Sequence, residues 1–313
     1  MCGAALKCTR MLRGVPFTRA IRKFVHQDFK EWLARLLSRP DIERELEESL
    51  SEHRSMRSDG LWKDIWDGQV LRNLRSPDGH LFISPHGDDL HLVFSLGVDG
   101  FNPGGKHTGK NTGSVQGIYM ICLNIPVEKR YDPENMFLAG LIPGPNKPSL
   151  DEINHGIKPL VDDLLDCWDP GLFISRTAMR HHGRRVLAAL IPLVCDILGA
   201  RQTGGFSTVT STLFCSFCYL TLDQIENFDM KSWRLRDGET HRRHAQAWRD
   251  ARTPEERDDI TKEFGVRDSE LLRLPYWDPI TCTILDSMHA FFLNSIPGHI
   301  RNVWGVSYDL RFR

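Results

Sequence analysis

Two long apolar runs of this chain each end on an aspartate, and this pattern constrains the fold more than any other feature. The run LHLVFSLGVD ends on Asp99, and the run HGRRVLAALIPLVCD ends on Asp196. Turn-forming residues follow Asp99 at once, so one interpretation is that it simply starts a turn. The other is that Asp99 binds a divalent metal from the C-terminal end of a sheet strand, because hard oxygen ligands suit such ions.

The order of the remaining elements narrows the choice. Residues 90–99, 116–125 and 135–143 have the composition of three consecutive strands, and their short connections indicate an antiparallel meander. The segment SLDEINHGIKPLVDDLLDCWDP then predicts a helix, with Ser149 and Glu152 in capping-box spacing. The apolar run ending on Asp196 follows this helix and is typical of a strand buried on both faces.

Three strands, a helix and a further strand predict an α/β fold with an RNase H-like mixed sheet, in which the first and fourth strands are neighbours. Asp99 and Asp196 then lie at the same end of the sheet. Two carboxylates so placed can share metal ions that activate the attacking oxygen and stabilise the leaving oxygen of a phosphodiester. The helical spacing of apolar residues within 24–51 adds a helical lead-in before this sheet.

Composition sets few further limits. The chain has 313 residues, 41% of them hydrophobic, and a formal net charge of -1, so its overall charge implies no polyanionic partner. Residues 1–39 are nevertheless basic, because only Asp28 and Glu31 oppose their positive charges. This segment is either a basic arm or a solvated terminal face.

No part of the sequence indicates a membrane or an oxidising compartment. The longest apolar stretch, VLAALIPLVCDILGA, is too short and too interrupted to span a bilayer, and the N-terminus lacks the apolar core of a signal peptide. Eight cysteines in a chain of this length do not form a disulfide scaffold. We therefore expect an intracellular protein without a membrane partner.

Cys215 and Cys218 have the spacing of a zinc knuckle, because two thiolates three positions apart can bind one tetrahedral ion. The alternative is two buried cysteines in an apolar loop. A CxxC pair supplies only half of a zinc site. The residues available to complete it are His289, Asp286, Cys282, His241 and His244.

Several blocks of the chain resemble transposases of the CACTA, or En/Spm-like, superfamily, in its fungal branch. They include VDGFNP, NMFLAGLIPGPNKPSL, PLVDDLL, PLVCDILGARQTGGF, FCSFC, WRDARTPEER, ELLRLPYWDP and DSMHAFFL. The resemblance implies an RNase H-like nuclease that uses three acids and two Mg²⁺ or Mn²⁺ ions to cut transposon ends and join them to target DNA. It also implies DNA as a partner, a nuclear location and a possible homo-oligomer.

Carried over residue by residue, the resemblance makes Asp99 and Asp196 the first two catalytic acids. Asp286 is the best candidate for the third, and Glu270 is a weaker one. If Asp286 instead belongs with the zinc ligands, the third acid is absent. Cys2 and Cys8, which resemble half of an N-terminal zinc knuckle, and the end of the sequence soon after the DSMH block indicate a fragment of a longer reading frame. In such transposases a CxxC or CxxH motif follows the second acid, which favours zinc and makes His289 our choice of third ligand.

The resemblance divides the chain into a basic arm with a helical lead-in (1–80), a catalytic core (81–206), and a region with a CxxC-containing, mainly helical insertion and the start of the remaining core (207–313). It implies phosphate contacts by four cations. Lys106 and Lys110 lie in a glycine-rich loop that lacks P-loop spacing, and Arg242 and Arg243 lie in a charged segment that also fits a solvated helix. The alternative function is an inactive remnant that still binds DNA or a partner.

Overall fold

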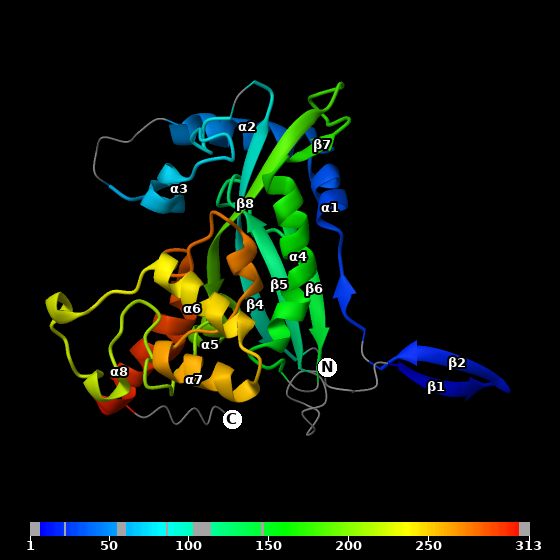
Figure 1. Ribbon diagram of the computed structural model, residues 1–313. Coiled ribbons are helices and arrows are strands. Elements are labelled where there is room, and N and C mark those ends of the chain that lie inside the picture. The colour runs from blue at the N-terminus through cyan, green and yellow to red at the C-terminus, as the bar shows by residue number, and fades with distance from the viewer. Residues whose placement is uncertain are drawn as a thin grey trace.

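Strands from both halves of the chain form one mixed sheet at the centre of the molecule (Figure 1). In the described part of the chain, eight α-helices, α1 to α8, accompany this sheet, so the predicted α/β class is confirmed. The computed structural model describes residues 7–21, 23–54, 61–85, 87–102, 114–144 and 147–306.

The central sheet has the strand order β3-β6-β5-β4-β8-β7, and β9 also pairs with β8. In order along the chain, the strands are β3 (Val25–His26), β4 (Leu90–Phe101), β5 (Val115–Cys122), β6 (Met136–Pro143), β7 (Leu172–Ile174), β8 (Arg184–Cys195) and β9 (Thr283–Leu285).

Strand pairing confirms the predicted arrangement of the two apolar runs. Strands β4, β5 and β6 form an antiparallel meander, and β8 lies parallel to β4 at its other edge. Strand β5 ends at Cys122, three residues earlier than predicted, because the side chain of Asn124 takes over as acceptor for the backbone N–H of Val93 at 2.8 Å. The short strand β9, parallel to β8, has no counterpart among the sequence predictions.

Helices α1 (Phe29–Leu36) and α4 (Glu152–Trp168) cover one face of the sheet. The rings of Phe29 and Trp32 pack on Phe94 of β4 and Phe137 of β6, with ring centroids 5.1–6.2 Å apart. The predicted capping box of α4 is present: the backbone N–H of each of its two residues donates to the side chain of the other, at 2.7 and 3.1 Å. The lead-in helices thus share one hydrophobic core with the sheet.

Helix α2 (Pro40–Arg54) is attached to the sheet by a buried ionic cluster. Glu43, which is fully buried, accepts hydrogen bonds from Thr177 Oγ1 at 2.6 Å and from the backbone N–H of Met179 at 2.8 Å, and pairs with Arg184 of β8 at 3.2 Å. Glu47 pairs with the same guanidinium. Every polar atom of the Glu43 carboxylate is therefore satisfied, which is the condition for tolerating a buried charge. The short helix α3 (Gln69–Asn73) follows α2.

Helix α5 (Ile197–Gly204) follows β8, and a long segment with α6 (Gly238–Asp250) and α7 (Pro254–Phe264) separates it from β9. Both helices confirm the helical character predicted for the charged segment 223–268. A π-helix (Met288–Ser295) and α8 (Ile296–Asn302) follow β9. Within the described ranges, no helix is long and apolar enough to cross a membrane.

The basic N-terminal segment, predicted to be an arm or a solvated face, contains an antiparallel hairpin of β1 (Lys7–Leu12) and β2 (Val15–Ala20). Its two-residue turn places Arg13 at φ 50° and Gly14 at φ 80°, as a type I′ turn requires. Nearly all its residues are exposed, and the hairpin stands away from the sheet (Figure 1).

Candidate active site

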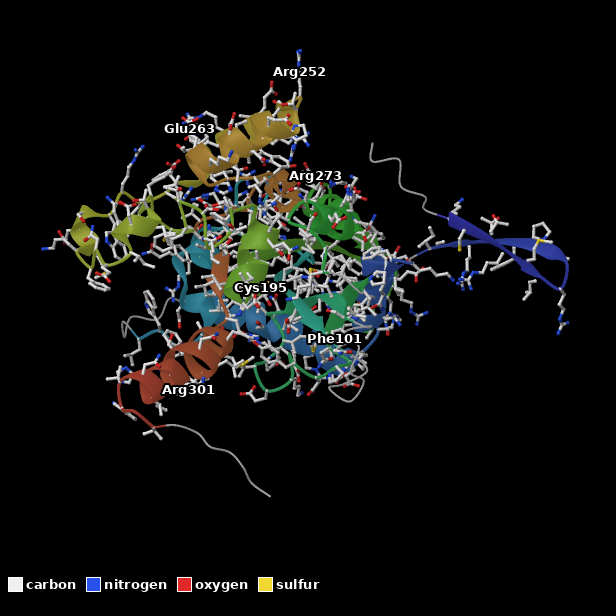
Figure 2. The ribbon with its side chains drawn as sticks, turned by 90° about the horizontal axis from the view of Figure 1, so that it is seen from below. Phe101, Cys195, Arg252, Glu263, Arg273 and Arg301 are labelled. Atoms are coloured by element: carbon white, nitrogen blue, oxygen red, sulfur yellow. The ribbon has the colours of Figure 1, made fainter. Side chains whose placement is uncertain are left out.

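Three acids lie at the same edge of the sheet, each near or directly after the end of one of three neighbouring parallel strands. Asp99 lies near the end of β4, Asp196 directly follows β8, and Asp286 directly follows β9. The last residues of β8 and β9, Cys195 and Leu285, are register partners, and the backbone N–H of Asp286 donates to the carbonyl of Cys195 at 2.8 Å. Figure 2 looks onto this end of the sheet, with Cys195 and Phe101 labelled. The structure therefore brings together all three acids that the sequence singles out.

The sequence predicts that Asp99 ends its strand, but β4 continues to Phe101, so Asp99 lies within the strand. Its register partner is Gly117, and its side chain is exposed. Its Oδ1 accepts a hydrogen bond from the following backbone N–H, that of Gly100, at 2.7 Å. The extended backbone on both sides holds the position of this carboxylate without burying it.

Asp196 has a structural role as well as its place beside Asp99. Its Oδ1 accepts from the backbone N–H of Gly199 at 2.6 Å and so caps the N-terminus of α5. A Cβ on Gly199 would lie 3.2 Å from the carbonyl oxygen of Val98, so glycine lets the first turn of α5 approach the end of β4 closely. The cap fixes the orientation of the Asp196 side chain toward this edge.

Asp286 is paired with His289, whose Nδ1 lies 2.6 Å from Asp286 Oδ2. Burial opposes ionisation of Asp286, but hydrogen bonds from the His289 ring and the backbone N–H of Met288 outweigh it and lower the pKa of this carboxyl. The same bond raises the pKa of His289, and the charges of Asp286, Asp99 and Asp196 raise it further. His289 therefore lies in the combined field of all three acids, and Asp286 is held in its ionised form.

We expect the imidazole of His289 to titrate above the usual pKa of about 6.5 in the native chain. Removing the hydrogen bond and the charge together, in Asp286→Asn, returns the midpoint toward that value, while Asp99→Asn produces a smaller downward shift. NMR titration of the His289 ring measures both. A midpoint that does not change in Asp286→Asn would contradict the pairing.

Two further residues of this edge were not predicted. The ring of Tyr119 covers Gly97, its register partner, so closely that a Cβ on Gly97 would lie 2.3 Å from it. Burial raises the pKa of Tyr119, with contributions from Cys195, Asp99 and Asp286. Burial also raises the pKa of the Cys195 thiol to about 12, and this neutral thiol accepts from the backbone N–H of Val98 at 3.3 Å. Alternation along the strands predicts only burial for these two side chains.

The donor set of this edge fits Mg²⁺ or Mn²⁺ in chemical type, because all three groups offer hard carboxylate oxygens. Within the described ranges, no group of three or more His, Cys, Asp or Glu side chains is arranged to hold an ion. Mg²⁺ is commonly bound through one or two carboxylates, with water and substrate phosphate as the other ligands. Glu270, the weaker candidate for the third acid, is paired instead with Arg273 at 2.8 Å.

The zinc ligands predicted from the sequence are not assembled in the structure. Cys215 and Cys218 lie together, and the backbone N–H of Phe217 donates to Cys215 Sγ at 3.4 Å. His289, however, lies with the acids, and no three-ligand group that includes the cysteine pair occurs in the described ranges. Arg236 occupies the centre of this loop, where its Nε donates to the carbonyls of Cys215 and Cys218 at 3.1 Å.

His241, one of the alternative zinc ligands, is 2% exposed on α6, and neither of its ring nitrogens has a hydrogen-bond partner. Burial and, to a smaller extent, the nearby charges of Arg236 and His244 lower its pKa to about 3. Since an unfolded histidine titrates near 6.5, the unfolded state binds the additional proton, and stability falls as the pH falls from 6.5 toward 3.

We expect the native chain to lose up to about 1.4 kcal/mol of unfolding free energy per pH unit in this window through His241 alone. His241→Leu removes that part of the acid dependence. Urea unfolding at pH 7, 6, 5 and 4 measures it in both proteins. Parallel pH profiles for the two proteins would show that His241 is not buried as a neutral ring.

The four predicted phosphate contacts divide into three groups. Lys106 and Lys110 lie outside the described residues. Arg242 is committed to structure, because its guanidinium donates to the carbonyls of Leu272, Leu274 and Trp277 and so fixes the segment before β9. Arg243 is exposed on α6 and donates only weakly to Thr240, at 3.5 Å.

This site and fold define a mixed α/β protein with an acidic edge on three parallel strands. A family model described as "Transposase family tnp2" matches residues 79–264, which is more than half of the chain, and the chain belongs to this family. The matched segment includes Asp99, Asp196 and both cysteines of the CxxC pair. A search of curated proteins finds no significant match.

Proposed function

We propose that this chain is the RNase H-like catalytic region of a CACTA-type DNA transposase of the fungal branch. Membership of the transposase family establishes the general role. The observation that carries the finer proposal is the position of Asp99, Asp196 and Asp286 on three adjacent parallel strands, in the order β6-β5-β4-β8-β9. The reaction proposed is hydrolysis of phosphodiesters at transposon ends followed by strand transfer to target DNA.

In this proposal the three carboxylates bind Mg²⁺ or Mn²⁺, which supplies charge stabilisation to the attacking and leaving oxygens. Asp99 projects from β4 where that strand is paired with β5, and Asp196 is oriented by its cap on α5. Asp286 is kept ionised by His289. A different local interaction thus positions each of the three acids on the same sheet.

The partners proposed with this function are transposon ends and target DNA, in the nucleus. The alternative is an inactive relative that retains DNA binding. It is favoured by one observation: within the described ranges, the acids do not form a three-ligand group around a single ion.

Incubation of the full chain with supercoiled plasmid, linear duplex and single-stranded RNA tests the proposal. We expect nicking or cutting of DNA with Mg²⁺ or Mn²⁺, none with EDTA, and no cutting of RNA. DNA binding without cleavage in any divalent ion would favour the inactive alternative. Preferential cutting of RNA would contradict both.

A further inference from the structure

Several positive charges without an ion pair among the described residues lie together on the β1–β2 hairpin. Lys7, Arg10, Arg13 and Arg19 lie on it, Lys23 follows, and none of these five takes part in an ion pair among the described residues. The hairpin sequence KCTRMLRGVPFTRA contains no acid. This concentration of cations has no counter-charge on its own surface.

Five arginines of the core and of the insertion are instead held by contacts within the protein. Arg184 is paired with the buried Glu43, Arg201, Arg236 and Arg242 donate to backbone carbonyls, and Arg267 pairs with Asp151. These guanidiniums stabilise loops and cannot reach a ligand without breaking several hydrogen bonds. The hairpin therefore concentrates accessible cations in one short element, whereas exposed cations of the insertion such as Lys231, Arg243 and Arg252 lie on separate elements.

The hairpin separates its side chains into two different faces. The register pairs Cys8 with Arg19, Arg10 with Phe17 and Leu12 with Val15, and these six side chains share one face because they alternate with the others. The opposite face carries Thr9 and Thr18, whose hydroxyls are 2.9 Å apart. One face thus combines two arginines with apolar side chains, of which Phe17 is 54% and Val15 65% exposed.

The sheet fixes where this hairpin begins relative to the acids. Residues 21–24 connect β2 to β3, and one row of register partners crosses the sheet from Val25 through Leu141 and Gly117 to Asp99. Three strand spacings of about 4.8 Å place Val25 about 14 Å from Asp99. Both views show the hairpin extending outward from the body (Figures 1 and 2).

We propose that the β1–β2 hairpin is a duplex-DNA contact that holds the substrate beside the acidic edge; this inference rests on the proposed function. Arg10 and Arg19 bind phosphates, and Phe17, Leu12 and Val15 lie against the groove. A two-stranded ribbon fits the major groove of B-DNA. Its six-residue strands are about 20 Å long, enough to follow several base pairs.

The test is the dissociation constant of the full chain for a 30-bp duplex in EDTA, measured by fluorescence anisotropy from 50 to 200 mM salt. Each phosphate contact contributes about 0.9 to the magnitude of the slope of log Kd against log salt concentration. Arg10→Gln/Arg19→Gln should therefore reduce the magnitude of this slope by about 1.8 and weaken binding roughly tenfold or more. The matched control Arg252→Gln/Lys231→Gln removes two exposed cations elsewhere and should change neither value.

Because EDTA prevents metal-dependent chemistry, this result does not depend on cleavage. An unchanged slope in the hairpin variant would overturn the inference even if the chain cuts DNA. Reduced binding in a chain that never cuts DNA would uphold the inference and leave only the nuclease function contradicted. If the Arg10→Gln/Arg19→Gln chain sediments differently in the absence of DNA but binds DNA with unchanged affinity, the inference is overturned. The hairpin would then be a contact between copies of the chain.

Discussion

Asp196→Asn is expected to lower Mg²⁺-dependent DNA cleavage by a factor of roughly 10² to 10³, the loss typical when a group that stabilises developing charge is removed. The substitution isolates charge from structure, because asparagine is as good an N-cap as aspartate and preserves the bond to Gly199. Asp99→Asn is expected to cause a similar loss with a change in stability within about 0.5 kcal/mol, since the Asp99 side chain is exposed. Initial rates of plasmid nicking measure both.

Asp259→Asn is the matched control, because Asp259 is an exposed acid of α7 whose only ion pair among the described residues is with Lys262. It should cleave at the native rate. Full activity in either Asp99→Asn or Asp196→Asn, with no loss relative to this control, would remove the acidic edge from the mechanism.

Glu43→Leu is expected to lower the free energy of unfolding by about 3–5 kcal/mol, the cost of breaking a buried charge pair. Two donors, Thr177 Oγ1 and the backbone N–H of Met179, lose their acceptor, and Arg184 loses one of its two carboxylates. Because Glu43 joins α2 to the β7–β8 connection, the loss falls on the end of the sheet far from the acids (Figure 1). Urea unfolding measures it.

Asp259→Leu supplies the comparison for this prediction as well. Both members of the Asp259 and Lys262 pair are more than three-quarters exposed, so its removal should cost less than about 0.5 kcal/mol. Equal, small losses in the two variants would show that the Glu43 cluster does not hold α2 in place.

The parts of the fold that sequence predicts well have strong local patterns. Two apolar runs that end on Asp99 and Asp196 identify β4 and β8, and the order of the elements predicts that these strands are neighbours, which they are. The capping-box spacing of Ser149 and Glu152 likewise predicts the start of α4. In each case the spacing of hydrophobic residues and the polar residues at the ends of the element indicate the same secondary structure. Local preference and tertiary packing therefore favour the same conformation.

Elements that depend on distant partners were missed or misassigned. Strand β9 has three residues and no alternation, and only its pairing with β8 makes it a strand. The sequence favours His289 as the third zinc ligand beside the two cysteines, and the fold instead pairs it with Asp286 at the acidic edge. Arg242 seemed a phosphate contact because sequence cannot show that carbonyls about thirty residues further on accept its hydrogen bonds.

The N-terminal hairpin shows the same limit at short range. Its turn is Arg-Gly rather than the Asn-Gly or Asp-Gly that signals a type I′ hairpin, so the positive φ of Arg13 gives no recognisable signature. Its strands mix basic, polar and apolar residues on each face and have no buried face. The sequence shows that this segment is basic, but it does not show that the segment forms a hairpin.

Calorimetric titration of Mn²⁺ into the purified chain, beside Asp99→Asn, Asp196→Asn and the control Asp259→Asn, tests the central claim most directly. The acidic edge predicts saturable binding to the native chain and to the control, weakened tenfold or more in each of the other two variants. Weak binding that is the same in all four proteins would contradict a metal-dependent site formed by these acids.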